Sequence, residues 1–314
     1  MSLRPYEADP FERSRGRLEA IAYRLLGSAG DAEDAVQDTF LRWHAADRER
    51  IETPAAWLTK VLTNLCLNQL TSARARRETY VGQWLPEPVL AGDRMLGPAE
   101  TAEQRESVST AMLILMERLS PNERAVYVLR EAFGYAHREI AEILDLTESN
   151  CQQIHRRAKQ HLSSGRARTE VDAAAARKVV EGFLAAALSG ETEPLIRLLT
   201  DDAVGVADGG ARVRARRTPV VGALGVARYL RGLFRPGAAK RAEAGGRAAL
   251  HAAVVNGSPA VLVAAGERIL AVLCLAPTPE GVEAVTIQVN PDKLERITRR
   301  WAAAGPHHPL AEIW

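Results

Sequence analysis

The chain has 314 residues, enough for two or three domains, and its net charge of +2 excludes a polybasic tail while leaving room for locally basic faces. The three cysteines are far apart and show no CxxC spacing, which excludes a disulfide framework or zinc knuckle and favours a reducing compartment. No apolar stretch reaches the roughly 18 residues of a spanning helix, and charges replace the apolar run of a signal peptide, so we expect a cytoplasmic protein without membrane contact.

The first predicted segment, residues 11–80, has apolar residues at the three- and four-residue spacing of helices. Within it, "GSAGDAEDAVQDTFLRWH" places Ala32, Val36, Phe40 and Trp43 on one apolar face. A second face of the same helix gathers carboxylates: Asp31, Asp34 and Asp38. Such a stripe suits a basic partner, although an ordinary solvated helix also explains it.

A second helix is predicted for "TPAAWLTKVLTNLCLNQLTSARARRE", which begins with Thr53 as a cap and Pro54 in the first turn. We expect Trp57 to pack in the core rather than act as a stacking wedge. Positive charges and amides lie away from the apolar face, where they suit a phosphate backbone. These residues are Lys60, Asn64, Asn68, Arg74, Arg76 and Arg77.

Prolines and glycines in "WLPEP" and "GDRMLGP" interrupt the helical pattern from residue 81 to 98, which predicts a linker. The pattern returns until residue 162 and includes a helix starting at Ser120 and Pro121. Residues 137–162, "HREIAEILDLTESNCQQIHRRAKQHL", predict two helices with a break at 145–147, and either Thr147 or Ser149 is able to cap the second.

The second of these helices turns Cys151, Ile154 and Ala158 inward and leaves a polar face outward. Amides and guanidinium groups match base edges in the major groove, and neighbouring cations pair with phosphates. An ordinary solvated helix of an antiparallel pair is the alternative. The residues predicted to face DNA are Ser149, Gln152, Gln153, His155, Arg156, Arg157 and Lys159.

From residue 171 the pattern becomes mixed: two helices, then strands separated by glycine and proline turns, with another helix at "GALGVARYLRGLF". The expected strands are "AVGVAD", "ARVRARR", "RAALHAAVVNG", "AVLVAAG", "RILAVLCLAP" and "GVEAVTIQV". We predict an α+β domain with a curved sheet wrapped on helices. Along the second strand Arg212, Arg214 and Arg216 would alternate to give one basic face, which meets the acidic stripe of the first segment, binds phosphate or is simply solvated.

The string "LSPNERAVYVLREAFGYAHREIAEILDLTESNCQQIHRRAKQHL" resembles the carboxy-terminal DNA-reading domain of extracytoplasmic-function RNA polymerase sigma factors. In that family the second helix of the pair reads the minus-35 promoter element. "GSAGDAEDAVQDTFLRWH" resembles the family's core-binding helix, which meets the clamp helices of the largest polymerase subunit. The resemblance implies core contacts at Asp31, Asp34, Val36, Gln37 and Asp38.

The helix from Thr53 resembles the family's melting and minus-10 reading helix, and residues 47–52 correspond to the loop that helps hold a flipped base. Asn68 is a departure, because the family commonly has aspartate there. This resemblance assigns the positive charges and amides of this helix to the minus-10 element.

The third segment resembles, by element order, a SnoaL-like cone related to nuclear transport factor folds, and three strings resemble a subgroup of sigma factors fused to such a domain. "WLPEP" and "NPDKL" are intact, whereas "DGGAR" replaces a DGGGK-like string. Gly209 and Gly210 predict a tight turn that presents the charges beside them. The resemblance predicts that the strings meet at a regulatory contact formed by Trp84, Pro86, Glu87, Asp208, Gly209, Gly210, Arg212, Asn290, Pro291, Asp292, Lys293 and Leu294.

The predicted organisation is region 2 at 9–80, a linker at 81–106, region 4 at 107–164, the SnoaL-like domain at 170–300 and a tail at 301–314. We expect a sigma factor that binds polymerase core and promoter DNA, is regulated by its own last domain, and needs no separate anti-sigma factor, cofactor or metal. The alternative is a one-component regulator with a ligand-binding cone. An enzyme is not expected, because the last domain lacks convergent acid and base groups.

Overall fold

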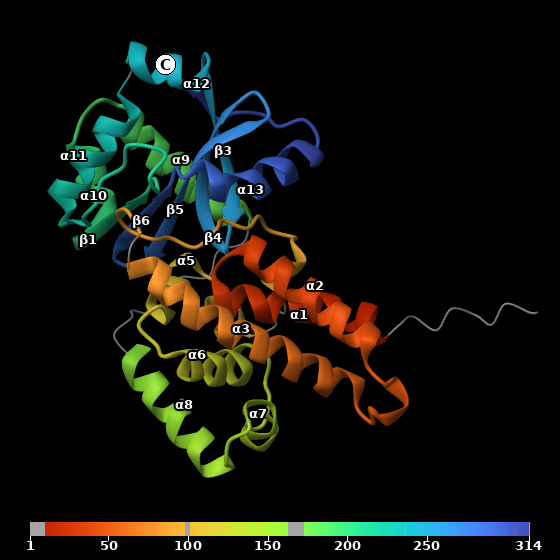
Figure 1. The fold of residues 1–314 in the computed structure, drawn as a ribbon. Coiled ribbons are helices and arrows are strands. Elements are labelled where there is room, and N and C mark those ends of the chain that lie inside the picture. The colour runs from red at the N-terminus through yellow and green to blue at the C-terminus, as the bar shows by residue number, and fades with distance from the viewer. Residues whose placement is uncertain (1–9, 79, 98–100, 163–172, 236, 314) are drawn as a thin grey trace, which may run out of the picture. The chain divides into compact units, whose positions relative to one another are not determined.

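The computed structural model describes the chain except residues 1–9, 79, 98–100, 163–172, 236 and 314 (Figure 1). It divides into two compact units. The helical unit comprises Met1–Glu78, Gly92–Val108 and Met112–Ser164, and the sheet unit comprises Thr79–Ala91, Ser109–Ala111 and Gly165–Trp314. No helix among the described residues is long and apolar enough to cross a membrane.

The first half of the helical unit is built from α1 (Pro10–Leu26), α2 (Ala29–Ala45) and α3 (Pro54–Glu78), with a short 3₁₀ turn η1 at Arg48–Arg50. The Ser28 hydroxyl accepts a hydrogen bond from the Asp31 amide and caps α2, while Pro54 opens α3 as the sequence predicts. The three helices share one core, in which the side chains of Trp43, Leu58 and Leu62 are buried.

The second half of the helical unit contains the elements η2 (Arg94–Leu96), α4 (Ala102–Glu106), α5 (Thr110–Met116, in this unit from Met112 on), α6 (Pro121–Tyr127), η3 (Val128–Ala132), α7 (His137–Leu144) and α8 (Glu148–Leu162). α6 begins with a capping box, since Ser120 and Glu123 satisfy each other's backbone amides. The predicted start at Ser120 and Pro121 is confirmed.

The sheet unit has one seven-stranded sheet in the order β2-β1-β6-β5-β4-β3-β7. Its strands are β1 (Leu199–Asp208), β2 (Val220–Val221), β3 (Ala248–Val255), β4 (Ser258–Ala265), β5 (Arg268–Thr278), β6 (Gly281–Gln288) and β7 (Ala311–Ile313). β1 and β6 pair in parallel and the other neighbours are antiparallel. The predicted α+β class is confirmed, and β4 and β5 pair as an antiparallel hairpin around Glu267.

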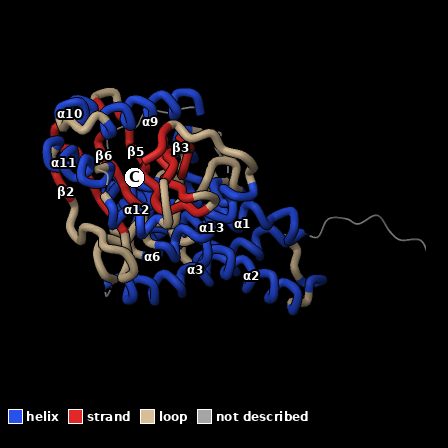
Figure 2. The backbone as a smooth tube through the Cα atoms, turned by 90° about the horizontal axis from the view of Figure 1, so that it is seen from above, coloured by secondary structure: helices blue, strands red, loops and turns tan. Residues whose placement is uncertain are grey.

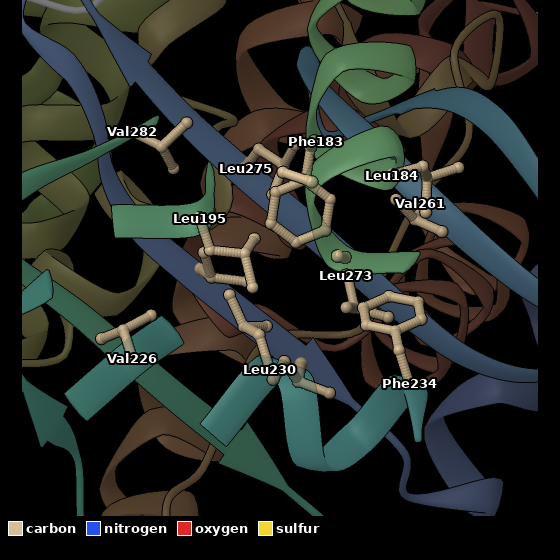
Figure 3. Packing of buried hydrophobic residues seen from close by; sticks show 14 of the residues in the cluster. Phe183, Leu184, Leu195, Val226, Leu230, Phe234, Val261, Leu273, Leu275 and Val282 are labelled. Carbon is tan, nitrogen blue, oxygen red and sulfur yellow. The ribbon is translucent and has the colours of Figure 1, made fainter. Parts of the chain in front are cut away.

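Helices cover both faces of this sheet, because successive strand residues point to opposite sides. The helices are α9 (Ala173–Leu188), α10 (Glu193–Leu198), α11 (Ala223–Phe234), α12 (Ala238–Ala244) and α13 (Pro291–Ala303). Phe183, Leu195 and Leu230 from α9, α10 and α11 pack on one face (Figure 3). Leu294, Ile297 and Trp301 of α13 pack on the other face with residues of β4 and β5, and Figure 2 shows these helices around the red strands.

Three predictions for the sheet unit are wrong. "ARVRARR" is not a strand: the amides of Arg212 and Val213 bond to the Gly209 carbonyl, so the chain turns and then runs irregularly. The alternating basic face predicted for Arg212, Arg214 and Arg216 therefore does not form. The last domain does not end at residue 300 either, because α13 continues to Ala303 and β7 pairs with β3.

Candidate functional site

The acidic face of α2 is present. Asp34, Gln37 and Asp38 are exposed and Asp31 is half-buried in the first turn. Val36 is only 2% exposed and belongs to the core face, so its prediction as a polymerase contact is wrong. The reason is helical spacing, since Val36 lies four residues after Ala32 and therefore faces the same core.

On the polar face of α3, the Lys60 side chain is bound to another helix of the same unit. The Lys60 ammonium lies 2.5 Å from Oδ1 of Asp145 and 3.0 Å from the Glu142 carbonyl oxygen, at the end of α7. Asn64 is half-buried and Asn68 is exposed. Arg74, Arg76 and Arg77 fall within α3, but their side chains lie outside the described residues.

Trp57 packs against Trp43, with ring centroids 5.6 Å apart and a 54° tilt. The Trp57 side chain is half-buried, so the core packing predicted for it is only partly confirmed.

The two helices α7 and α8 meet at the predicted break. Asp145 ends α7 in the left-handed conformation (φ 54°, ψ 46°), and the Thr147 hydroxyl accepts a hydrogen bond from the Asn150 amide at 3.2 Å. Thr147, rather than Ser149, is therefore the cap of α8. Cys151, Ile154, Ala158 and Leu162 are buried. The exposed residues of the predicted DNA-reading face are Ser149, Gln152, Gln153, Arg156, Arg157 and Lys159.

His155 does not share this exposure, and its predicted outward position is wrong. Its Nε2 lies 2.8 Å from Oε1 of Glu131 in η3, and its Nδ1 lies 3.3 Å from Nε2 of His137. The hydrogen bond from His155 is the main cause that lowers the pKa of Glu131. His155 therefore ties α8 to η3 and α7, and its side chain is 14% exposed.

The left-handed residue at the break supports a stability prediction. Glycine adopts this conformation freely, so Asp145→Gly should change the free energy of unfolding by less than about 0.5 kcal/mol, whereas Asp145→Val should lower it by about 1–2 kcal/mol. Urea denaturation of both variants checks this. Equal losses for glycine and valine would mean that backbone strain does not decide the effect.

Arg24 of α1 forms hydrogen bonds with the second half of the linker. No sequence motif predicted this role for Arg24. It is fully buried, and its guanidinium donates to the Leu96 carbonyl at 2.6 Å, the Ser107 hydroxyl at 2.9 Å and the Gln104 carbonyl at 3.3 Å. Burial lowers the pKa of Arg24 to about 10, which leaves it protonated at neutral pH. Leu96, Gln104 and Ser107 are thereby tied to α1 within the helical unit.

The first half of the linker, by contrast, is held in the sheet unit around Asp208. This carboxylate is fully buried at the end of β1, and its Oδ2 accepts from the Leu85 amide at 2.9 Å. Its Oδ1 accepts from the Tyr80 hydroxyl at 2.6 Å. Both donors come from the segment that contains "WLPEP".

Lys293 completes the contact. Its ammonium lies 2.7 Å from Oδ2 of Asp208 and 2.6 Å from the Leu85 carbonyl oxygen, and it sits over the Trp84 ring at 4.4 Å from the centroid. "WLPEP", "DGGAR" and "NPDKL" therefore each contribute to one cluster, which we call the linker clasp: Tyr80, Trp84, Leu85, Asp208 and Lys293. Its regulatory role stays a prediction.

The other residues of these strings support the clasp. The Asn290 side chain caps α13, accepting from the Asp292 amide at 3.2 Å, and donates to the Tyr80 hydroxyl at 2.9 Å. Gly210 has φ 56°, and a Cβ there would lie 2.8 Å from Nδ2 of Asn290. Pro86 is buried, Glu87 is half-buried and Leu294 packs in the core. Arg212 and Asp292 form an ion pair at 3.3 Å that is exposed on both sides.

Sequence reasoning missed three contributors to this contact: Tyr80, Gln288 and Asn256. Gln288 of β6 donates to Oδ2 of Asp208 at 3.3 Å. Asn256, at the β3–β4 turn, accepts from the Val89 amide at 3.0 Å and returns a backbone hydrogen bond at 2.9 Å. "VVNGS" was recognisable as a turn, but nothing in the sequence indicated that the turn binds the linker.

Acid should loosen the clasp. Burial by itself would raise the pKa of Asp208, but the charge of Lys293 and the hydrogen bonds from Lys293, Tyr80 and Leu85 outweigh burial and lower that pKa. The carboxylate therefore stabilises the fold above its unfolded pKa of about 4, and this contribution is lost as pH falls through the folded pKa. We expect the Tm difference between the wild type and Asp208→Asn to shrink below about pH 4. A difference that persists in acid would contradict this.

Comparison with known proteins places the helical unit in a family. Residues 11–76 match the sigma-70 region 2 family and residues 110–162 match sigma-70 region 4. The ECF RNA polymerase sigma factor SigJ of Mycobacterium tuberculosis is 36% identical over 230 residues, which cover 73% of each chain. This chain is an extracytoplasmic-function RNA polymerase sigma factor. As such it binds RNA polymerase core and promoter DNA and directs promoter-specific transcription initiation.

A further relative and the solved structure of SigJ extend the likeness of this sigma factor into the sheet unit. The probable ECF RNA polymerase sigma factor SigI of Mycobacterium tuberculosis is 31% identical over 288 residues, covering 90% of this chain and 92% of that one. The crystal structure of Mycobacterium tuberculosis SigJ aligns with a TM-score of 0.70 at 30% identity, covering 91% and 98% of the two chains. The region 2 match favours a sigma factor over a one-component regulator, and sigma factors in general are not enzymes.

Proposed function

We propose that this sigma factor is regulated in cis by its sheet unit, which holds the first half of the linker between region 2 and region 4. The observation that carries the proposal is the linker clasp. In it the buried ion pair of Asp208 and Lys293 forms hydrogen bonds with both the amide and the carbonyl oxygen of Leu85. Buried charges need partners, so the docked linker completes the hydrogen bonding of Asp208 and Lys293. The clasp thus binds the linker by its backbone and by two aromatic rings.

We expect that docking of the linker in the clasp lowers transcription. Regions 2 and 4 act on two separate promoter elements, so the linker must be free to span between them. Docking residues 80–91 shortens the free chain, and because the sheet unit is tethered to the linker its effective concentration is high. Release of the clasp therefore shifts the population toward extended forms that suit polymerase and promoter DNA.

Because the regulator is part of the same chain, the proposal also holds that no separate anti-sigma factor is needed. We place the protein in the cytoplasm, where bacterial polymerase and promoter DNA lie. Ending the chain at Ser164 removes the residues that hold the linker, so promoter-specific transcription with core polymerase should change. Unchanged transcription would contradict regulation by the sheet unit.

The contacts with polymerase and DNA are proposed from the exposed faces of α2, α3 and α8. Asp31, Asp34, Gln37 and Asp38 suit a basic surface of the polymerase clamp helices, and Lys60, Asn64 and Asn68 suit the minus-10 region. Lys60 is bound to Asp145 and Glu142 in this structure, so contact with DNA requires that this pair opens.

The minus-35 assignment predicts a measurable loss of promoter affinity. Arg157→Ala should weaken binding of the reconstituted holoenzyme to its promoter by about tenfold or more, because a base contact by arginine contributes about 1–3 kcal/mol. Filter binding at fixed salt measures this, with Arg228→Ala at an exposed position of α11 as the control. Equal affinities for the two variants would remove Arg157 from the DNA-reading face.

A further inference from the structure

The sheet unit contains a cavity of about 780 Å³ that neither the linker clasp nor the DNA-reading helices use. Sheet residues form one wall, and α11, α12 and α13 form the others. Small-molecule sites in proteins usually measure about 300–1,000 Å³. The cavity is therefore large enough for a ligand with a substantial apolar body.

The walls are mainly apolar. Leu233 and Phe234 of α11 face Val263, Leu273 and Ile287 of the sheet across the cavity, and Figure 3 shows Phe234 beside Leu273. Few donors or acceptors lie along these walls, so a nucleotide or sugar would lose hydrogen bonds to water without replacing them. A hydrocarbon body loses none, and burying it is favourable.

The polar groups around the cavity are predominantly positive. Arg214, Arg268 and Arg299 line it and make no ion pair within the described part of the chain, and Glu295 is the single carboxylate in the lining. Lys240 also lines the cavity, but its ammonium binds the carbonyl oxygens of α11's last turn, including that of Gly232 at 2.6 Å. The arginines are therefore the cations left for a ligand.

Two of these arginines come from neighbouring elements, Arg268 from the start of β5 and Arg299 from α13. The Ile269 amide donates to the Thr298 hydroxyl at 3.2 Å, which brings the neighbouring residues Arg268 and Arg299 to the same edge of the cavity. Tyr229 adds a neutral hydroxyl, because burial raises its pKa. Arginine binds carboxylates through two parallel hydrogen bonds, so this edge suits one carboxylate group.

We propose that this cavity binds amphipathic carboxylates, with the hydrocarbon body between α11 and the sheet and the carboxylate on Arg268 and Arg299. Ligands of this class satisfy both features of the site, since the body fills the apolar walls and the acid group neutralises the arginine edge. The site is separate from the linker clasp: Lys293 and Asp208 do not line it.

Isothermal titration of the full chain with dodecanoate, below its micelle concentration, tests the proposal. We expect one dodecanoate per chain and binding at least about tenfold weaker for dodecanol, which has the same body without the charge, because hydrogen bonds to a charged group are stronger than neutral ones. The double variant Arg268→Gln/Arg299→Gln should lose about tenfold or more in dodecanoate affinity. The control double variant Arg197→Gln/Arg228→Gln, on exposed positions of α10 and α11 outside the cavity, should bind normally.

A second variant separates the cavity from the arginine edge. Ala271 of β5 lines the cavity, so Ala271→Phe should fill it and abolish binding while the arginines remain. Thermal unfolding confirms that each variant is folded. Failure of dodecanoate to bind the full chain, equal affinity for dodecanol, or unchanged affinity in the arginine double variant would each overturn the proposal.

Discussion

Replacing Asp208 by alanine should lower the stability of the sheet unit by about 3–5 kcal/mol, because the change leaves the Lys293 ammonium buried without its carboxylate partner. The Lys293 side chain is only 11% exposed and Asp208 is fully buried, so water cannot replace the lost interaction. The amides of Leu85 and Gly210 and the Tyr80 hydroxyl lose their acceptor in the same step. Urea denaturation of the full chain measures the loss.

The same substitution should also release the linker. Hydrogen exchange of residues 80–91 should become faster in Asp208→Ala, while exchange in α1 and α2 stays the same. Asp292→Ala is the matched control, because Asp292 lies in the same string but its pair with Arg212 is exposed on both sides and contributes about 0–1 kcal/mol. Comparable losses for Asp208 and Asp292 would mean that the buried pair does not hold the linker.

The second large effect is expected at Arg24. Arg24→Met keeps an unbranched apolar side chain but removes every donor, so the carbonyl oxygens of Leu96 and Gln104 and the Ser107 hydroxyl lose a buried partner. Unsatisfied buried polar groups cost about 1–3 kcal/mol each, and we expect the helical unit to lose about 3–5 kcal/mol. Urea denaturation measures the loss, and faster hydrogen exchange at residues 94–97 and 101–107 locates it.

Arg94→Met provides the control for Arg24. Arg94 is also an arginine near this segment, but its side chain is 64% exposed and lies 3.6 Å from Glu19. Although the Glu19 side chain is only 12% exposed, the Arg94 guanidinium stays in contact with water, so we expect Arg94→Met to cost about 1 kcal/mol. Equal losses of stability in Arg94→Met and Arg24→Met would contradict the claim that the buried hydrogen bonds of Arg24 hold the linker.

Local patterns were sufficient to predict most helices and strands. The cap at Ser120, the proline at the start of α3, and the break at 145–147 depend on residues within a few positions of one another. The segment "ARVRARR" failed because its alternation suggested a strand, whereas Gly209 starts a turn: a Cβ there would lie 2.2 Å from the Val213 carbonyl oxygen. Alternation predicts a strand only where a partner strand is available.

The missed site residues depend on contacts far apart in the chain. Tyr80 meets Asp208 across 128 positions and Arg24 meets Ser107 across 83, and neither contact leaves a periodic or spacing signal. His155 was placed outward because helical spacing identifies the strongest core positions, Cys151, Ile154 and Ala158, but not a polar partner such as Glu131 on another element. Long-range polar pairing is the part of the site that local patterns cannot supply.

The most direct test of regulation in cis is run-off transcription with purified core polymerase and no other sigma factor, comparing the full chain with Lys293→Met. This substitution removes the ammonium that holds both Asp208 and the Leu85 carbonyl oxygen, and Arg212→Met serves as the exposed control. We predict that Lys293→Met gives several-fold more transcript from the same start site than either the wild type or Arg212→Met. Equal or reduced transcript from a folded Lys293→Met chain would contradict restraint by the linker clasp.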